Sequence, residues 1–442
     1  MNSAARVLVT QGRFASGVFG ATLNFDERYF WQPPGLGLLS ALSYRVFGFG
    51  IWQTRLLPLL CGGVVVWLGG RIALQLTNNV AASAAASLLI AVDPRFITVA
   101  RGSRMDTPAI GLLMAAVLII LKSNAWWAGG LAGVATAAAC LTHPLSVIWL
   151  VPLAALSWRR GPKLTASFSL GGLAIAGVWL AWLLPNRSTF VDQFLHHGAT
   201  RSKPDSVILR IPTNLAHFVQ NSGRSPLIPL LAAVLLLVAV REWRKGDTVA
   251  GLLASVVAFT SLATLGLLNW NAGFYEQYWL PAVYVSAAVL VARKRSNLLL
   301  VIIALTVASG AVVSYGGRSA VLIREWDERD YSLVQTLVKK HVKRGDVVWG
   351  EPAVWYAVER QGAVLDLRDS DSPSVPLPKS PSPRRHNVLL VRSPTHVRAQ
   401  CFHDLGYQFV GRTQAKSEPT YKLEVWRLRV VSPEIRRPKS CR

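Results

Sequence analysis

The chain has 442 residues, of which 52% are hydrophobic and 16% are charged, and its formal net charge is +24. Soluble domains carry roughly 25% charged residues, so this composition argues against a soluble protein. A basic chain can bind nucleic acid through a soluble basic surface, but here the basic residues stand between apolar runs. We therefore expect membrane lipids as partners, and no nucleic acid.

Apolar runs recur between residues 36 and 315. A helix of about 20 apolar residues crosses the roughly 30 Å hydrocarbon layer of a bilayer. The run 36–49 is shorter and predicts a juxtamembrane or tilted helix. The longer runs predict a polytopic α-helical membrane protein of about ten transmembrane helices, near 55–70, 80–94, 107–121, 125–140, 143–157, 166–184, 226–240, 249–268, 279–292 and 297–315.

Basic residues set the expected orientation of these helices. Clusters at 159–163, 241–245 and 293–295 fall in every second connection, and Arg71 and Lys122 lie in the other short connections of the same parity. Because cytoplasmic loops are enriched in Lys and Arg, all five connections are predicted to be cytoplasmic. The outward-facing segments are then 1–54, 95–106, 185–225, 269–278 and everything after 315.

The part after residue 315 predicts a small soluble α/β domain. The chain then divides into an outward-facing loop with amphipathic juxtamembrane helices (1–54), a transmembrane domain (55–315) and an exoplasmic α/β domain (316–442). The last is either a globular cap or a contributor to acceptor choice. Cys401 and Cys441 lie in it and could pair. Strands are predicted at 345–350, 363–367, 386–391, 407–412 and 421–428, and helices at 330–343, 353–360 and 395–405.

The most specific motif is the polar, aromatic loop that ends in Tyr29-Phe-Trp-Gln-Pro-Pro34 and runs directly into apolar sequence. It resembles the first outer loop of the GT-C glycosyltransferases that use polyprenyl-phosphate sugars. This superfamily includes the protein O-mannosyltransferases and the lipid A aminoarabinose transferases. Ala5–Phe14 fits the amphipathic helix of that loop, and residues 29–34 fit its Pro-Pro element. Gln32 stands where the lipid A transferases carry Lys.

The beginning of the chain departs from the family pattern. The families place an Asp-Glu motif before the amphipathic helix, and the predicted topology also requires a membrane span ahead of residues 1–54. Both arguments predict an in-frame extension upstream of Met1 that encodes about 20 apolar residues and an acidic pair. The alternative is an inactive, truncated paralogue.

A second outward loop, from Asp93 to Pro108, carries several arginines. Arg101 and Arg104 are candidates for holding a lipid phosphate, because a guanidinium pairs with phosphate oxygens in a bidentate way. The resemblance aligns Asp106 with an Asp that opens the next helix in the GT-C families, which makes it a catalytic candidate. Asp106-Thr-Pro is also a good helix start, and the sequence leaves both interpretations open.

Further candidates lie at the outer ends of other spans. His143 stands where the families often carry His or Lys, and it is either a substrate-binding or a structural residue. Tyr275 and Tyr278 resemble the last active-site loop of the families, and an aromatic belt explains them equally well. The usual base of the families is the absent carboxylate, so Asp106 and Asp26 are the candidate replacements. The loop 185–225 is either a cover over the site or solvated surface.

The resemblance implies transfer of a sugar from a polyprenyl-phosphate donor to an acceptor on the outer face, in the inner or plasma membrane of a bacterium. The acceptor is a lipid, a glycan or a protein. We expect no cofactor apart from the lipid-linked donor, and no residue pattern marks a metal site. The alternative is a non-enzymatic membrane protein, either a transporter of lipid-linked sugars or an inactive paralogue. A polysaccharide polymerase is a third possibility.

Overall fold

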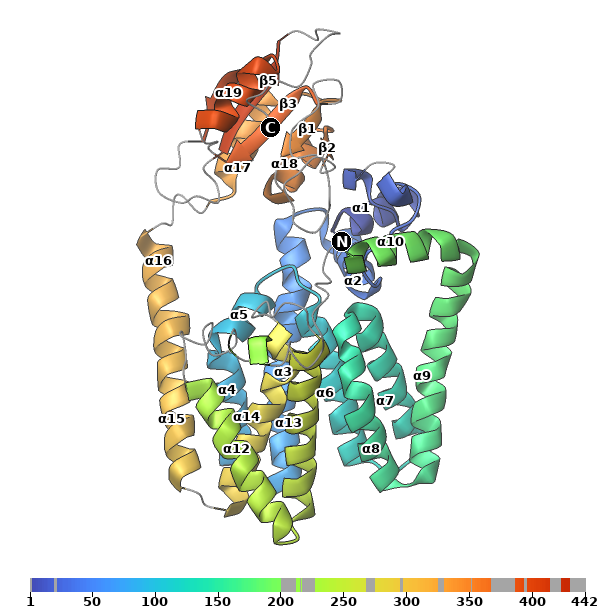
Figure 1. Cartoon of the computed structure of the whole chain (residues 1–442), viewed down its shortest axis with the longest axis vertical. Coiled ribbons are helices and arrows are strands. Elements are labelled where there is room, and N and C mark those ends of the chain that lie inside the picture. Colours follow the sequence, from blue (N-terminus) through green and yellow to red (C-terminus); the bar gives the residue numbers. More distant parts are fainter. Residues whose placement is uncertain are drawn as a thin grey trace.

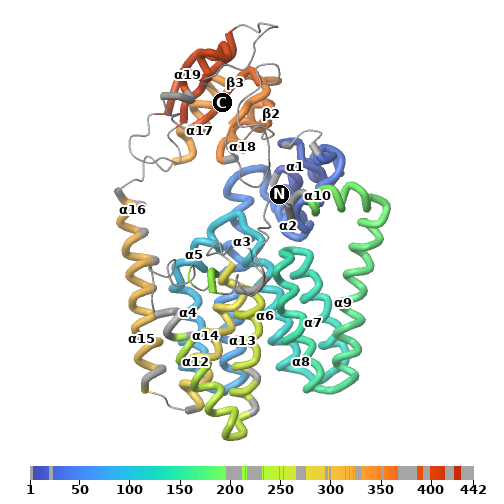
Figure 2. The backbone as a smooth tube through the Cα atoms, viewed as in Figure 1, coloured from blue at the N-terminus to red at the C-terminus, as the bar shows by residue number. Residues whose placement is uncertain are grey.

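The structure is a computed structural model of the whole chain. It describes residues 2–19, 22–199, 212–214, 216, 227–267, 275–294, 297–324, 330–350, 352–366, 386–392, 396–413 and 423–429. Figure 1 shows a bundle of long helices, a small α/β unit above it, and the two N-terminal helices between them. Figure 2 shows α9 and α15 on opposite flanks of the bundle.

Most of the described chain is helical. Two helices form the N-terminal segment, α1 (Asn2–Gln11) and α2 (Gly35–Phe47). The bundle then contains, in chain order, α3 (Ile51–Thr77), α4 (Val80–Val92), α5 (Pro94–Ala100), α6 (Asp106–Lys122), α7 (Trp126–Thr142), α8 (Leu150–Arg160), α9 (Pro162–Leu183), α10 (Arg187–Ala199), α12 (Leu227–Arg244), α13 (Thr248–Leu267), α14 (Leu280–Lys294), α15 (Asn297–Ala311) and α16 (Arg318–Arg324). Two 3-10 helices matter for the site, η3 (Pro144–Trp149) and η6 (Tyr275–Tyr278).

Several helices are apolar enough to cross a membrane. Within the described ranges, three stretches are long enough by themselves: Ile51–Thr77, Pro162–Leu195 and Leu300–Val321. A fourth is the pair α4 and α5, which bend by 69° at Asp93 and form either a broken span or a re-entrant loop. Shorter apolar helices include Trp126–Thr142. The helices thus support a membrane protein, whereas the predicted count of about ten spans is not confirmed.

Small residues let two helices of the bundle approach closely. A Cβ added at Gly133 of α7 would lie 2.9 Å from the backbone nitrogen of Gly172 in α9. A Cβ at Gly130 would lie 3.1 Å from Oγ of Ser167. Small residues at such contacts favour helix association in membranes, where no hydrophobic effect drives it. This packing fixes α7, whose carboxyl end carries Thr142 and His143.

The α/β unit contains one five-stranded sheet in the order β2-β1-β3-β5-β4. Strand β1 pairs in parallel with β2 and β3, and β5 pairs antiparallel with β3 and β4. The strands agree with the five predicted ones: β1 (Val347–Gly350), β2 (Val364–Asp366), β3 (Val388–Arg392), β4 (Tyr407–Arg412) and β5 (Leu423–Leu428). The helices of the unit are α17 (Ser332–His341), α18 (Trp355–Arg360) and α19 (His396–Asp404).

The cysteines of the helical bundle differ in oxidation state from the described cysteine of the α/β unit. Cys61 and Cys140, in the helical bundle, are free thiols. Cys401, in α19, is disulfide-bonded. Its expected partner, Cys441, lies outside the described residues.

The α/β unit shares a core with the N-terminal segment. Ala5, Val18, Ala41 and Tyr44 belong to the same buried apolar cluster as residues of α17, α18 and the sheet. The unit therefore packs on the N-terminal loop.

Three hydroxyl groups, which we call the domain junction, lie at this contact. The Thr54 hydroxyl is 2.6 Å from the Tyr44 hydroxyl and 2.5 Å from that of Tyr356. The two tyrosine hydroxyls are 3.2 Å apart. Beside them, Nε of Arg6 lies 3.6 Å from Oε1 of Glu359.

Candidate active site

Asp106 is the first residue of α6 and is fully buried. Its Oδ2 accepts a hydrogen bond of 2.8 Å from Nε of Arg104. The N-cap of α6 is Met105, and no side chain caps this end of the helix. The carboxylate thus takes part in a polar cluster, although its charge also lies favourably at a helix N-terminus.

His143 faces the other oxygen of that carboxylate. It lies between α7 and η3, where its Nδ1 accepts a hydrogen bond of 3.1 Å from the Leu145 amide. In the neutral ring the proton is then assigned to Nε2. This atom lies 3.8 Å from Oδ1 of Asp106, which is too long for a hydrogen bond. Oδ1 accepts no hydrogen bond within the described part of the chain.

The aromatic loop covers His143. Its ring centroid lies 5.6 Å from that of Tyr275 and 5.0 Å from that of Tyr278. Residues three apart in a 3-10 helix point the same way, so η6 presents both rings to the histidine. The Tyr278 carbonyl accepts a hydrogen bond of 2.8 Å from Nε1 of Trp149. The structure thus brings together five of the predicted residues: Arg104, Asp106, His143, Tyr275 and Tyr278.

The Pro-Pro loop lies next to His143 because Gly35, which follows the two prolines, packs closely on the end of α7. Gly35 begins α2 and packs on the end of α7: a Cβ there would lie 2.7 Å from Cα of Thr142 and 2.9 Å from the Leu141 carbonyl oxygen. Only a residue without a side chain permits this approach. The Gln32-Pro33-Pro34 turn therefore lies beside the segment that carries His143, and Gln32 itself is half-buried.

Two predicted residues lie differently. Asp26 is exposed in a turn, and no described contact joins it to Asp106 or His143. Arg101 is exposed at the carboxyl end of α5. The predicted outward loop 185–225 is helical over Arg187–Ala199. Most of its remainder lies outside the described residues.

The sequence analysis did not predict the contacts of a second set of buried charges. Arg95 of α5 forms an ion pair with Glu276 of η6. Asp93 caps α5 by accepting hydrogen bonds from the amides of Arg95 and Phe96, and its Oδ2 accepts a bond of 2.6 Å from the Tyr284 hydroxyl. These contacts join α5 and its N-cap residue to η6 and α14. Ionisable residues at membrane depth and the helix-starting Asp-Pro were signals that could have found them.

Gln277 is a further residue that the sequence analysis missed. It is fully buried in η6, between Glu276 and Tyr278. Neither polar atom of its amide has a hydrogen-bond partner in the part of the chain that the structure describes. Buried polar groups are nearly always bonded, so η6, which also carries Tyr275 and Tyr278, contains polar atoms that the described chain does not satisfy.

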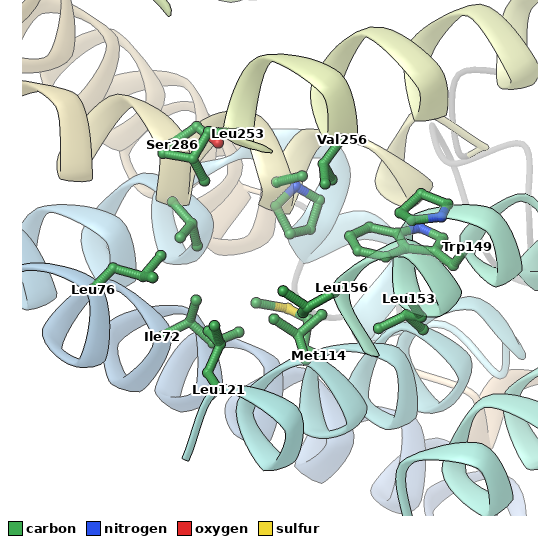
Figure 3. A pocket seen from close by; sticks show the side chains of 15 residues that line it. Ile72, Leu76, Met114, Leu121, Trp149, Leu153, Leu156, Leu253, Val256 and Ser286 are labelled. Atoms are coloured by element: carbon green, nitrogen blue, oxygen red, sulfur yellow. The ribbon is translucent and has the colours of Figure 1, made fainter. Parts of the chain in front are cut away.

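An apolar pocket lies next to this cluster. It has a volume of about 70 Å³ and is lined by α3, α6, α8, α13 and α14, with Trp149 among its side chains. Figure 3 shows Leu, Ile, Val and Met side chains around it and Ser286 among them. Since Trp149 also bonds to Tyr278, the pocket and the polar cluster share a wall. The pocket is small, and its lining suits a hydrocarbon.

Comparisons with known proteins agree with the predicted superfamily. Residues 31–185 match the family model of the dolichyl-phosphate-mannose-protein mannosyltransferases. This stretch includes the Pro-Pro loop, Asp106 and His143. A comparison with curated proteins finds no match.

Solved structures show the fold. The crystal structure of ArnT from Cupriavidus metallidurans in the apo state has a TM-score of 0.58 and 14% identity, over 96% of this chain and 92% of that one. The same protein bound to undecaprenyl phosphate gives 0.57 and 13%, with the same coverage. The chain is thus a helical membrane protein with the GT-C fold and a small sheet, and the predicted resemblance to the GT-C glycosyltransferases is confirmed.

A metal site receives no support within the described ranges, where no group of three or more His, Cys, Asp or Glu residues could hold an ion. The expectation that no metal or cofactor takes part stays a prediction.

Proposed function

We propose that the protein is a membrane glycosyltransferase that transfers a sugar from a polyprenyl-phosphate donor to an acceptor on the outer face. The observation that carries this proposal is the cluster of the half-buried Arg104 with the buried Asp106 and His143. It lies at the ends of helices α6 and α7, and one oxygen of Asp106 accepts no hydrogen bond within the described chain. A buried charged cluster with an incomplete network is typical of a functional site.

In this proposal Arg104 and Arg101 hold the donor phosphate, and Gln32 adds a hydrogen bond. Tyr275, Tyr278 and His143 line the sugar. The lipid tail leaves along apolar surface, for which the pocket beside Trp149 is the nearest candidate. The charge on the phosphate matches the guanidinium groups, which would also stabilise the negative charge that develops on the leaving group.

Asp106 acts as the general base. The acceptor hydroxyl or amine attacks the anomeric carbon of the sugar, and its proton passes to Asp106. The bond between the anomeric carbon and the phosphate oxygen breaks, and polyprenyl phosphate leaves with the bonding electron pair. Arg104 gives this step a control: when the donor phosphate draws Arg104 away from Asp106, Oδ2 of the carboxylate is released from its hydrogen bond and can accept the proton. Asp26 is the weaker candidate because it is exposed.

The bundle and the soluble unit divide this work by compartment. We propose the division into 1–54, 55–315 and 316–442, with the shorter apolar helices also crossing the bilayer of a bacterial inner or plasma membrane. The basic connections support this orientation, and the disulfide at Cys401 supports an oxidising exterior. Alkaline phosphatase fused after Ser319 should be active, and the same enzyme fused after Lys294 should be inactive. The reverse pattern would overturn the orientation.

Transfer itself is tested with a labelled polyprenyl-phosphate sugar and the protein in lipid vesicles with a membrane extract as acceptor source. The expected result is release of polyprenyl phosphate and label in one acceptor class, which extraction separates into lipid, glycan and protein. Movement of the donor across the bilayer with its sugar–phosphate bond intact would favour the transporter instead.

A further inference from the structure

Gln193, in the middle of α10, is fully buried and makes three hydrogen bonds to one distant stretch of backbone. Its Nε2 donates to the carbonyls of Leu23, at 2.8 Å, and Arg28, at 2.9 Å. Its Oε1 accepts a bond of 2.6 Å from the Phe30 amide. One side-chain amide thus serves the backbone on either side of the turn at 24–28.

Aromatic contacts hold the same segment against the same helices. The ring centroid of Phe30 lies 4.8 Å from that of Trp182, in α9, and 5.9 Å from that of Phe190, in α10. Phe14 also contacts Trp182, at 6.1 Å. The segment before the Pro-Pro turn is therefore packed on α9 and α10.

The backbone that Gln193 contacts is strained. Leu23 has φ of 51° and Asn24 has φ of 57°, a left-handed conformation that residues other than glycine rarely adopt and that is tolerated better by Asn than by Leu. Such strain persists only where the surroundings over-determine it, and it is frequent at functional sites. The hydrogen bond from Gln193 to the Leu23 carbonyl acts directly on the strained residue.

We propose that Gln193 is a positioning residue that holds the Pro-Pro loop in the conformation that binds the donor. The loop is fixed at two points on either side of Gln32: Gln193 bonds the Phe30 amide, and Gly35 packs on Thr142 beside His143. Between these points the Pro-Pro turn has little freedom, since proline restricts its own φ and the residue before it. The inference rests on the proposed function, in which Gln32 contacts the donor phosphate.

The test variant is Gln193→Met, which keeps the length of the side chain and removes its hydrogen bonds. Hydrogen exchange of residues 22–35 should become faster, while exchange in α6 and α14 stays unchanged. The KM for the donor should rise about tenfold, in line with lost buried hydrogen bonds, and kcat should change much less. Asp192→Asn, on the exposed face of the same helix, is the matched control and should leave both measurements unchanged.

Each outcome is informative. Unchanged exchange in Gln193→Met, or faster exchange with an unchanged KM, overturns the positioning role. If the parent chain binds and transfers no donor, the proposed function fails, whereas the exchange result still reports whether Gln193 holds the loop. Should Gln193→Met not fold, Gln193→Glu replaces it. That variant keeps the acceptor for Phe30 but turns an oxygen toward two carbonyls, and it should give the same pattern.

Discussion

The domain junction and the candidate site are both largely buried polar clusters, and they differ in how completely their hydrogen bonds are made. At the junction, the hydroxyls of Tyr44, Thr54 and Tyr356 bond to one another without formal charge. At the site, charged groups gather, and Asp106 Oδ1 and the Gln277 amide lack partners in the described chain. A complete network rigidifies a contact, whereas an incomplete one is costly unless something else completes it.

The two clusters also differ in the charge of their groups. Burial, with a further contribution from the neighbouring Tyr356, raises the pKa of the Tyr44 phenol above its ordinary value. The junction therefore stays neutral at physiological pH, and its stability should not depend on pH there. The site, in contrast, is built from groups whose charges the proposed chemistry needs. The junction thus holds the N-terminal segment and the α/β unit together, whereas the proposed role of the site is to bind a ligand.

The largest expected effect is that of Asp106→Asn, which keeps the shape of the site and removes its base. General base catalysis contributes roughly 100-fold to 10,000-fold, so transfer should fall by a factor in this range while donor binding persists. The rate of label transfer at saturating donor measures it. Asp26→Asn is the control and should stay near the parent rate. Loss of transfer in Asp26→Asn together with an active Asp106→Asn would exchange the two roles.

The next effect concerns the donor phosphate. Arg104→Ala should remove a charge-assisted contact of about 1.5–3 kcal/mol, which corresponds to a loss of donor affinity of about tenfold or more. Arg101→Ala should also lower the donor affinity, but by a smaller factor, because Arg101 is exposed and solvent screens its charge. Equilibrium binding of a labelled donor analogue measures both. Equal affinity in the parent and both variants would remove the arginines from the phosphate site.

The sequence predicted several parts of the site one by one, because each carries a local signal. The Pro-Pro turn, the arginines around Asp106 and the Tyr-x-x-Tyr loop are patterns over a few residues. Their convergence depends on helix packing, which no local pattern records. Gly35 lies on Thr142, Arg95 pairs with Glu276, and each pair is far apart in sequence.

In the fold, too, the elements encoded by short sequence patterns were predictable, whereas contacts between residues far apart in sequence were not. The five strands of the α/β unit were predictable from β-branched runs between turns. The break of the predicted span 80–94 at Asp93 was recoverable from its Asp-Pro signal. In contrast, the docking of α18 on the N-terminal segment, through Tyr356 and Tyr44, depends on tertiary contacts between residues more than 300 positions apart.

A smaller effect on stability and on donor binding is expected at Gly35, which follows the Pro-Pro turn and packs on the end of α7. Gly35→Ala inserts a Cβ against Thr142 and Leu141, and overpacking of this kind costs about 1–3 kcal/mol. The melting temperature should fall, and the KM for the donor should rise because α2 must shift away from His143. Gly17→Ala, in the same outer loop but with open space around its Cβ position, should leave both values near those of the parent. An unaffected Gly35→Ala would mean that the loop does not need this contact.

The smallest effect is expected at the domain junction, where removing a hydroxyl should change stability and leave donor binding unchanged. Tyr356→Phe and Tyr44→Phe should each lower the free energy of unfolding by about 1 kcal/mol, and the double variant should lose less than the sum because the hydroxyls share one network. The KM for the donor should not change. Tyr331→Phe removes a tyrosine hydroxyl that bonds Ala353 within the α/β unit, so its effect should add to that of Tyr44→Phe. A donor KM that rises in Tyr356→Phe without a change in stability would mean that the junction also serves the ligand, and the distinction between the two clusters would fail.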